Sequence, residues 1–368
     1  MKVGMIIGKS TPKRSGVENY IFNLVRGLKS KIPDDLTLIT SADNRAFGEI
    51  PRIVPRYPFP VHISLFWGQT LSLQKKILSE FDVIHNPSHY FLFKKPGRKY
   101  VSTIHDLTSI LYPQWHPWWR TLVSGTALSR MIVQSDRIIA NSRQTKNDII
   151  SHYNISSDRV SVTYLGASDE FRPLDTQTTD AVRKKYHLDH PFVLYVGNLE
   201  PRKNLPSLIR AIARCRVQHP YLQLVIAGRY GWMYADIFRT VTELHLEKSV
   251  RFLDYVPDSD LPALYNAAII FVYVPFYEGF GIPVLEAMQC GTPVITSNTS
   301  SLPEVAGDGG IMVNPLDVNG IAEKISMLVS DDDAMEENSR YNLTQCRKFS
   351  WEKCTDQTLD VYREVSEG

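Results

Sequence analysis

The chain has 368 residues, of which 43% are hydrophobic and 22% are charged, and its formal net charge is +2. This length favours two domains over a single core, and the composition is that of an ordinary globular protein. No stretch is long enough to be a transmembrane helix, which argues against an integral membrane protein and leaves peripheral contact as the expected mode of any membrane binding.

The net charge is unevenly distributed. Residues 1–168 carry 22 Lys+Arg against 11 Asp+Glu, or +11, and the remainder carries 19 against 28, or −9. A basic first half attracts anionic partners such as phosphate groups, acidic lipid headgroups or nucleic acid. The alternative is a basic surface that is merely solvated.

The first half begins as a doubly wound α/β domain. Val3–Ile7 predicts a buried parallel strand, and a polar turn to Gly16 leads into a helix with apolar residues at helical spacing from Val17 to Leu28. The turn lacks the G-x-G-x-x-G spacing, so the sequence gives little support to a nicotinamide site. Val3–Ile7 is also too short for a signal-peptide core. Further strands are predicted at 36–40, 82–85, 100–104, 137–140 and 160–165.

An aromatic stretch, Tyr112–Arg120, interrupts this pattern. It holds Trp115, Trp118 and Trp119 beside two prolines and an arginine. Such residues either touch a bilayer interface, stack on a sugar, or pack inside a long loop, and packing is the favoured interpretation.

The chain becomes polar around Ala167–Thr179, which predicts an interdomain linker. A second α/β region follows, with a helix after Asp317 and a last helix around 351–365. Its strands are predicted at 192–196, 222–227, 250–253, 269–272, 293–296 and 310–313. The four cysteines of the chain have no metal-ligand spacing and are expected to be reduced, packed thiols of a cytosolic protein; they are Cys215, Cys290, Cys346 and Cys354.

The most informative stretch is Tyr277–Met288, which follows an apolar strand. Its two glycines permit a tight turn, and Pro283 suits the first position of a helix. Glu278 is then expected on the loop and Glu286 in the first helical turn. A carboxylate at each end of a glycine turn, next to a helix N-terminus, suits a ligand with both hydroxyls and phosphate. The alternative is that Glu286 only complements the helix dipole and Glu278 is a solvated loop residue.

Other polar residues are expected at the carboxyl ends of strands, where open α/β sheets bind ligands. Arg202 and Lys203 form a cation pair that fits a diphosphate, although two solvated loop cations are the alternative. His105-Asp106 ends another strand. Ser15-Gly16 opens the first helix and is placed to present backbone amides to an anion.

Together, these residues resemble the retaining glycosyltransferases of family 4. The resemblance runs from Gly16 to Trp351-Glu352 over nearly the whole chain. Its specific part is the E-x7-E block with the Arg-Lys pair, and its weaker parts are Thr103–Asp106 and Ala140–Ser142. The resemblance implies the GT-B architecture, in which two Rossmann-like doubly wound parallel-sheet domains face a cleft. It places an acceptor-binding domain at 1–170, joined by a C-terminal helix at about 352–368, and a donor-binding domain at 171–351.

The resemblance also implies roles for single residues. Glu278 holds donor-sugar hydroxyls, Arg202 and Lys203 neutralise the departing diphosphate, and His105 contacts the sugar from the opposite domain. The implied donor-binding residues are Gly16, Tyr255, Val256, Phe280, Gly281, Leu285 and Glu286, with Glu286 on the ribose and Tyr255-Val256 against the base. The family often has paired glycines where this chain has Ser15-Gly16, which weakens the phosphate assignment of that loop.

The expected activity is transfer of a hexose from a nucleotide sugar, of GDP-mannose or UDP-glucose type, with retained configuration. The acceptor is expected to be a saccharide or a lipid-linked saccharide in polysaccharide or glycan biosynthesis. No cofactor and no metal are expected, because Asp258-Ser259-Asp260 directly precedes an apolar helix and is better explained as its N-cap. We expect a cytoplasmic protein, with peripheral contact with an anionic membrane at its inner face, and no nucleic acid.

Three alternatives remain at the level of sequence. A sugar-nucleotide epimerase or phosphorylase of the same fold is the nearest enzymatic one. A nicotinamide oxidoreductase is favoured only by the doubly wound pattern. A non-catalytic sugar-nucleotide-binding subunit is opposed by the intact set of Arg202, Lys203, Glu278 and Glu286.

Overall fold

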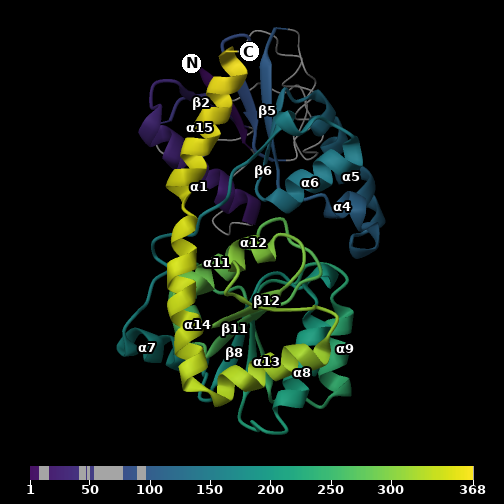
Figure 1. The fold of residues 1–368 in the computed structure, drawn as a ribbon, viewed down its shortest axis with the longest axis vertical. Coiled ribbons are helices and arrows are strands. Elements are labelled where there is room, and N and C mark those ends of the chain that lie inside the picture. Colours follow the sequence, from purple (N-terminus) through teal and green to yellow (C-terminus); the bar gives the residue numbers. More distant parts are fainter. Residues whose placement is uncertain (8–15, 41–46, 48–49, 54–77, 89–96, 368) are drawn as a thin grey trace. The chain divides into compact units, whose positions relative to one another are not determined.

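A computed structural model describes residues 1–7, 16–40, 47, 50–53, 78–88 and 97–367. The chain forms two compact units, each with its own sheet (Figure 1). The first unit comprises Met1–Pro113, Trp118–Gly166 and Ser350–Gly368. The second comprises Gln114–Pro117 and Ala167–Phe349. Ser15 lies outside the described residues.

Seven parallel strands of the described residues form the first sheet, in the order β3-β2-β1-β4-β5-β6-β7. Every residue of β1 and β4, and every residue of β5 after the first, is buried, as expected where helices cover both faces. The strands are β1 (Val3–Ile7), β2 (Leu36–Thr40), β3 (Arg52–Ile53), β4 (Val83–Asn86), β5 (Lys99–Ile104), β6 (Arg137–Ala140) and β7 (Val160–Val162). The short β3 had no signal in the sequence.

Helices cover the first sheet, and the last helix of the chain belongs to this unit. α15 runs alongside α1 and also contacts β4, β5 and β6 (Figure 1). The helical elements are α1 (Gly16–Lys31), α4 (Thr108–Leu111), α5 (Trp118–Gln134), α6 (Arg143–Tyr153), η3 (Ser157–Arg159) and α15 (Trp351–Glu367). The short η2 (Pro113–Trp115) begins at the last residue before the chain enters the second unit.

A buried hydrogen-bond chain fastens α15 to the first sheet. The Tyr362 hydroxyl lies 2.6 Å from His85 Nδ1, and His85 Nε2 lies 2.9 Å from the hydroxyl of Thr103. Thr103 in turn meets the hydroxyl of Tyr20 on α1 at 2.9 Å. Burial, with a further contribution from His105, lowers the pKa of His85 to about 3, so its ring is neutral at physiological pH.

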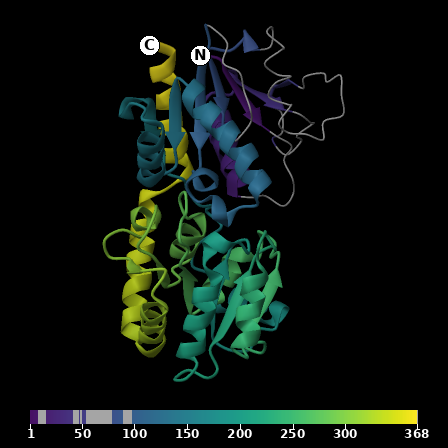
Figure 2. The same ribbon diagram turned by 90° about the vertical axis from the view of Figure 1, so that its right-hand side faces the viewer.

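The second sheet has six parallel strands in the order β10-β9-β8-β11-β12-β13, again the doubly wound pattern, and helices cover both of its faces (Figure 2). The strands are β8 (Phe192–Val196), β9 (Gln223–Ala227), β10 (Val250–Asp254), β11 (Ile270–Tyr273), β12 (Val294–Ser297) and β13 (Ile311–Val313). The helical elements are α7 (Thr176–Tyr186), η4 (Pro201–Lys203), α8 (Leu205–Cys215), α9 (Ala235–Glu243), α10 (Leu261–Ala267), α11 (Ile282–Gln289), α12 (Leu302–Ala306), α13 (Val318–Ser330), α14 (Asp332–Gln345) and η5 (Cys346–Lys348).

The predicted interdomain linker is wrong at its C-terminal end. The polar linker predicted to reach Thr179 already contains helix α7, because the Asp175 carboxylate accepts the Thr178 N–H and caps that helix. Asp331 similarly caps α14 by accepting the Ala334 N–H. In contrast, the prediction of unpaired, packed cysteines is confirmed, since all four thiols are free and buried. No helix among the described residues is long and apolar enough to span a membrane.

Candidate active site

Arg202, Lys203 and Glu278 meet at the carboxyl ends of two neighbouring strands. The cations lie on η4, after β8, and Glu278 lies on the loop after β11, which pairs with β8. Glu278 Oε1 accepts from Arg202 Nη1 at 3.0 Å and also from Lys203 Nζ. Two positive side chains therefore converge on one carboxylate oxygen.

Two further residues, Glu200 and Tyr273, complete this cluster, and neither was expected from the sequence to be a site residue. The Glu200 carboxylate accepts from Arg202 Nε at 3.1 Å. The Tyr273 hydroxyl accepts from Lys203 Nζ at 2.5 Å and donates to Glu278 at 2.7 Å. Two cations and two carboxylates give a cluster whose formal charges cancel, and every member is at least half-buried.

The electrostatics of the cluster follow from burial and close pairing. Burial alone would raise the pKa of Glu278, but Arg202 and Lys203 outweigh it and hold that pKa below the usual value. Burial lowers the pKa of Lys203, and the neighbouring Arg202 lowers it further, against the opposing effect of the two carboxylates. Glu278 is therefore ionised at neutral pH, and the charge of Lys203 depends on its anionic neighbours.

A glycine with a positive φ and two serines shape the turn after Glu278. Gly281 has φ +108°, and a Cβ built there would lie 2.5 Å from Leu302 Cδ2, so only glycine fits. The Ser301 hydroxyl lies 2.9 Å from the carbonyl oxygens of both Glu278 and Phe280. The Ser300 hydroxyl oxygen accepts a hydrogen bond from the Glu278 N–H at 3.0 Å. Hydrogen bonds from two serines of the loop after β12 therefore fix the conformation of this turn.

Helix α11 begins one residue earlier than the sequence predicted. Gly281 is the N-cap and Ile282 the first helical residue, so Pro283 occupies the second position. The prediction that Glu286 lies in the first turn is therefore wrong, and it lies in the second. Leu285 is fully buried in the core of the unit.

Glu286 has a different environment from Glu278. Its carboxylate is buried, and Oε2 accepts from the Tyr265 hydroxyl at 2.9 Å. Burial raises the pKa of Glu286 to about 8, with a small addition from Asp258 and an opposing effect of the Tyr265 bond. Tyr265, which is itself buried, had no signal in the sequence beyond its place in an apolar helix.

The segment Tyr255-Val256 lies after β10. The Arg229 guanidinium lies over the Tyr255 ring, 4.6 Å from its centroid, and Val256 is buried. Asp260 occupies the N-cap position of α10, but its side chain makes no capping bond. It instead accepts from Lys185 Nζ and the Tyr186 hydroxyl, each at 2.5 Å, which corrects the capping prediction. No group of three or more His, Cys, Asp and Glu among the described residues is arranged to hold a metal ion.

Gly16 and His105 belong to the first unit. Gly16 is the first residue of α1, and a Cβ there would meet nothing within 4 Å. His105 follows β5 and is buried. Its Nε2 lies 2.9 Å from the Pro87 carbonyl, so this nitrogen carries a proton, and the Tyr20 ring meets it edge-on at 5.0 Å.

The aromatic stretch divides into a packed and an exposed part. The Trp115 ring stacks on Phe276, as the packing interpretation predicted. Trp118 and Trp119, at the start of α5, are 79% and 52% exposed, so for them that interpretation is wrong.

Comparison with known proteins identifies the family. The model described as "Glycosyltransferase Family 4" matches residues 14–171, and that described as "Glycosyl transferases group 1" matches residues 177–345. O-antigen chain mannosyltransferase B of Escherichia coli is 37% identical over 288 residues, which cover 76% of this chain and 74% of that protein. The chain belongs to glycosyltransferase family 4.

Other relatives of this glycosyltransferase extend over its full length. D-inositol 3-phosphate glycosyltransferase of Corynebacterium glutamicum is 26% identical, with 99% of this chain and 97% of that protein covered. A crystal structure of Anabaena HepE in complex with UDP and glucose superposes with a TM-score of 0.77 at 20% identity, covering 99% of both chains. HepE with UDP-glucose gives 0.76 at 21%, covering 99% of this chain and all of that one. The expected GT-B fold of two Rossmann-like domains is confirmed.

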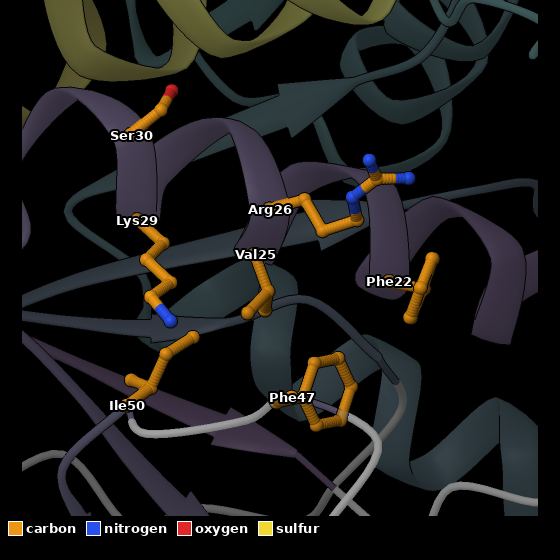
Figure 3. A pocket seen from close by; sticks show the side chains of 7 residues that line it. All are labelled: Phe22, Val25, Arg26, Lys29, Ser30, Phe47 and Ile50. Atoms are coloured by element: carbon orange, nitrogen blue, oxygen red, sulfur yellow. The ribbon is translucent and has the colours of Figure 1, made fainter.

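The first unit of the glycosyltransferase has a pocket of about 480 Å³, and none of the site residues described above lines it (Figure 3). Apolar side chains and two cations form its walls, and none of them was selected from the sequence. The lining residues are Phe22, Val25, Arg26, Lys29, Ser30, Phe47 and Ile50.

Proposed function

We propose that the chain is a retaining glycosyltransferase that moves a hexose from a nucleotide-diphosphate sugar to a saccharide or lipid-linked acceptor in polysaccharide or glycan biosynthesis. The observation that carries this proposal is the convergence of Arg202 and Lys203 on one oxygen of Glu278. A planar guanidinium and a compact ammonium, side by side at the end of a strand, match the charge of a leaving diphosphate.

The proposed chemistry requires Arg202 and Lys203 to exchange part of their pairing with carboxylates for pairing with the donor phosphates. In the free protein the two cations are neutralised by Glu278 and Glu200. When the donor binds, its phosphates share the cations, and Glu278 accepts hydrogen bonds from sugar hydroxyls. The transition state resembles an oxocarbenium ion with a departing diphosphate, so stabilising that anion is the main catalytic contribution. We assign no covalent nucleophile, and the leaving phosphate takes the acceptor proton on the same face.

The remaining donor contacts are also part of the proposal. Glu286 binds the ribose, Tyr255 and Val256 lie against the base, and Leu285 supports the nucleotide side of the site. The amides of Phe280 and Gly281 face the sugar or phosphate. Gly16 and His105 are assigned to the phosphate and the sugar on the strength of the family resemblance. The reaction is proposed to need no metal, since Arg202 and Lys203 supply the positive charge.

GDP-mannose is the first donor to test and UDP-glucose the second. The Escherichia coli mannosyltransferase relative supports the first, and the HepE structure with UDP-glucose supports the second. A thermal shift with each nucleoside diphosphate distinguishes the bases, because a ligand that binds only the folded state raises the unfolding temperature.

The deciding experiment incubates the purified chain with either donor and a mannose- or glucose-terminated oligosaccharide, with and without EDTA. We expect release of nucleoside diphosphate and an NMR-detected product with the anomeric configuration of the donor, both insensitive to EDTA. An inverted product would refute retention, and loss of turnover in EDTA would refute metal independence. Donor turnover without transfer to the saccharide would favour the epimerase or phosphorylase alternatives.

We also propose that the first unit contacts an anionic membrane, at its cytoplasmic face, through the start of α5. Trp118, Trp119 and Leu122 are exposed there, and residues 107–135 contain Arg120 and Arg130 but no acidic residue. Tryptophan rings and arginine suit a negatively charged interface. Sedimentation with phosphatidylglycerol vesicles should fall in Trp118→Ala/Trp119→Ala. Equal binding by this variant would exclude the surface.

A further inference from the structure

The segment Gln114–Pro117 lies in sequence between two helices of the first unit, yet it is part of the second. The chain therefore passes from one unit to the other at four points, after Pro113, Pro117, Gly166 and Phe349. The first two crossings enclose only four residues. So short a segment needs specific contacts to stay bound to the second unit. These contacts extend to Arg202 of the cation cluster.

Trp115 is the centre of these contacts. Its ring stacks on Phe276 with centroids 5.7 Å apart and planes at 18°. Its carbonyl accepts the indole N–H of Trp232 at 2.7 Å, and the neighbouring His116 ring packs on Trp232 at 5.6 Å. Phe276 follows β11 and Trp232 follows β9, so the segment is held at the same edge of the sheet as the cluster.

Phe276 connects this stack to Arg202. The Phe276 N–H donates to the Arg202 carbonyl at 2.9 Å, which fixes the backbone of η4. The carbonyl oxygen of the next residue, Tyr277, accepts from Arg202 Nη1 at 3.2 Å, which fixes the guanidinium. On the other side, the Thr299 hydroxyl donates to the Phe276 carbonyl at 3.2 Å. Main-chain bonds of two consecutive residues thus orient both ends of Arg202.

We propose that Trp115 is a positioning residue for the diphosphate site, acting on Arg202 through Phe276; this rests on the proposed function of Arg202. Phe276 is only half-buried, and the Trp115 ring covers one face of it. Removing the indole frees Phe276 to move, and a displacement of about 1 Å in a group that acts in the transition state costs up to about 10²-fold in rate. Binding of the donor in the ground state is spread over many other contacts and changes less.

The test compares Trp115→Ala, Trp115→Phe and Arg202→Gln with Tyr221→Ala, which alters an exposed aromatic residue of the same unit. Steady-state kinetics with the nucleotide-sugar donor should show kcat reduced about 10- to 100-fold in Trp115→Ala, with the donor KM changed less than about threefold. Trp115→Phe keeps a ring to stack and should recover most of kcat. Tyr221→Ala should match the wild type.

Two results would overturn the inference while the proposed function stands. The first is Trp115→Ala with a kcat within twofold of the wild type while Arg202→Gln loses turnover. The second is an equal loss in Trp115→Phe together with a lowered unfolding temperature, which would show a structural role alone. Full turnover in Arg202→Gln would refute the proposed site itself, and the inference with it.

Discussion

The two glutamates on either side of the glycine turn are equally buried, but their surroundings have opposite effects on their charge. Glu278 meets Arg202, Lys203 and the Tyr273 hydroxyl, and the two cations hold the pKa of Glu278 below its usual value. Glu286 has the Tyr265 hydroxyl, and burial raises its pKa to about 8. One carboxyl is therefore ionised at neutral pH and the other is mainly protonated.

The difference shows that the spacing of two identical residues does not determine their chemistry. In the proposed function, Glu278 lies where the charged part of the donor binds, and its negative charge balances Arg202 and Lys203 before the diphosphate arrives. Glu286 is proposed to bind the ribose, which is neutral and whose hydroxyls both donate and accept hydrogen bonds. Titratable pairs whose surroundings push their pKa values apart are typical of functional sites.

Replacing Lys203 should have the largest effect, because it removes one of the two cations that distinguish Glu278 from Glu286. Lys203→Ala should lower kcat about 10²- to 10³-fold, as expected for loss of a group that stabilises a developing anion. Steady-state turnover of the nucleotide-sugar donor is the measurement. Lys248→Ala, at an exposed lysine of the same unit, is the control. Comparable activity in both variants would remove Lys203 from the site.

Glu286→Gln tests the raised pKa directly. The unfolded chain releases this proton near pH 4.5 and the folded chain near pH 8, so the folded state holds more protons between these values. The wild type should therefore lose stability relative to the Gln variant as pH rises from about 5 to 8, by about 1.4 kcal/mol per unit of pKa shift. Urea unfolding at both pH values is the measurement. Parallel changes in the two proteins would mean that the pKa of Glu286 is ordinary.

Gly281→Ala tests whether the turn that separates the two carboxylates requires glycine. The positive φ and the contact with Leu302 should together cost about 1–3 kcal/mol of unfolding free energy. Gly125→Ala, inside α5 with only Ile110 near its new Cβ, should instead be neutral or stabilising by up to about 1 kcal/mol. Chemical unfolding followed by circular dichroism compares the two. Equal effects would show that position 281 does not require glycine.

The smallest effect is expected for Tyr265→Phe, which takes the hydroxyl away from Glu286 Oε2. Because that bond favours the charged carboxylate, its loss should move the pKa of Glu286 further upward. The stability cost should be about 1 kcal/mol. A pH titration of unfolding free energy against the wild type measures the shift, and a downward shift would contradict the assignment.

Much of the fold was predictable because parallel strands buried on both faces are continuous apolar runs, as at Val3–Ile7 and Phe192–Val196. The site residues were predictable because polar residues that directly follow such runs lie at strand ends. The hydrogen-bonding partners of these site residues were not predictable. Tyr265 and Tyr273 lie within apolar segments that indicate only core, and Glu200 meets Arg202 through a local turn. The start of α11 at Ile282 depends on the left-handed conformation of Gly281, which the letter sequence does not specify.

The four passages of the chain between its units have a practical consequence for dissecting the protein. A fragment made of residues 167–349 would lack Trp115, and its counterpart 1–166 would lack helix α15 together with the Tyr362 hydroxyl that meets His85. Neither half can be excised intact with a single cut. Chimaeras that exchange donor specificities should therefore transplant the tetrapeptide Gln114–Pro117 together with the C-terminal sheet, and should keep the last helix with the host.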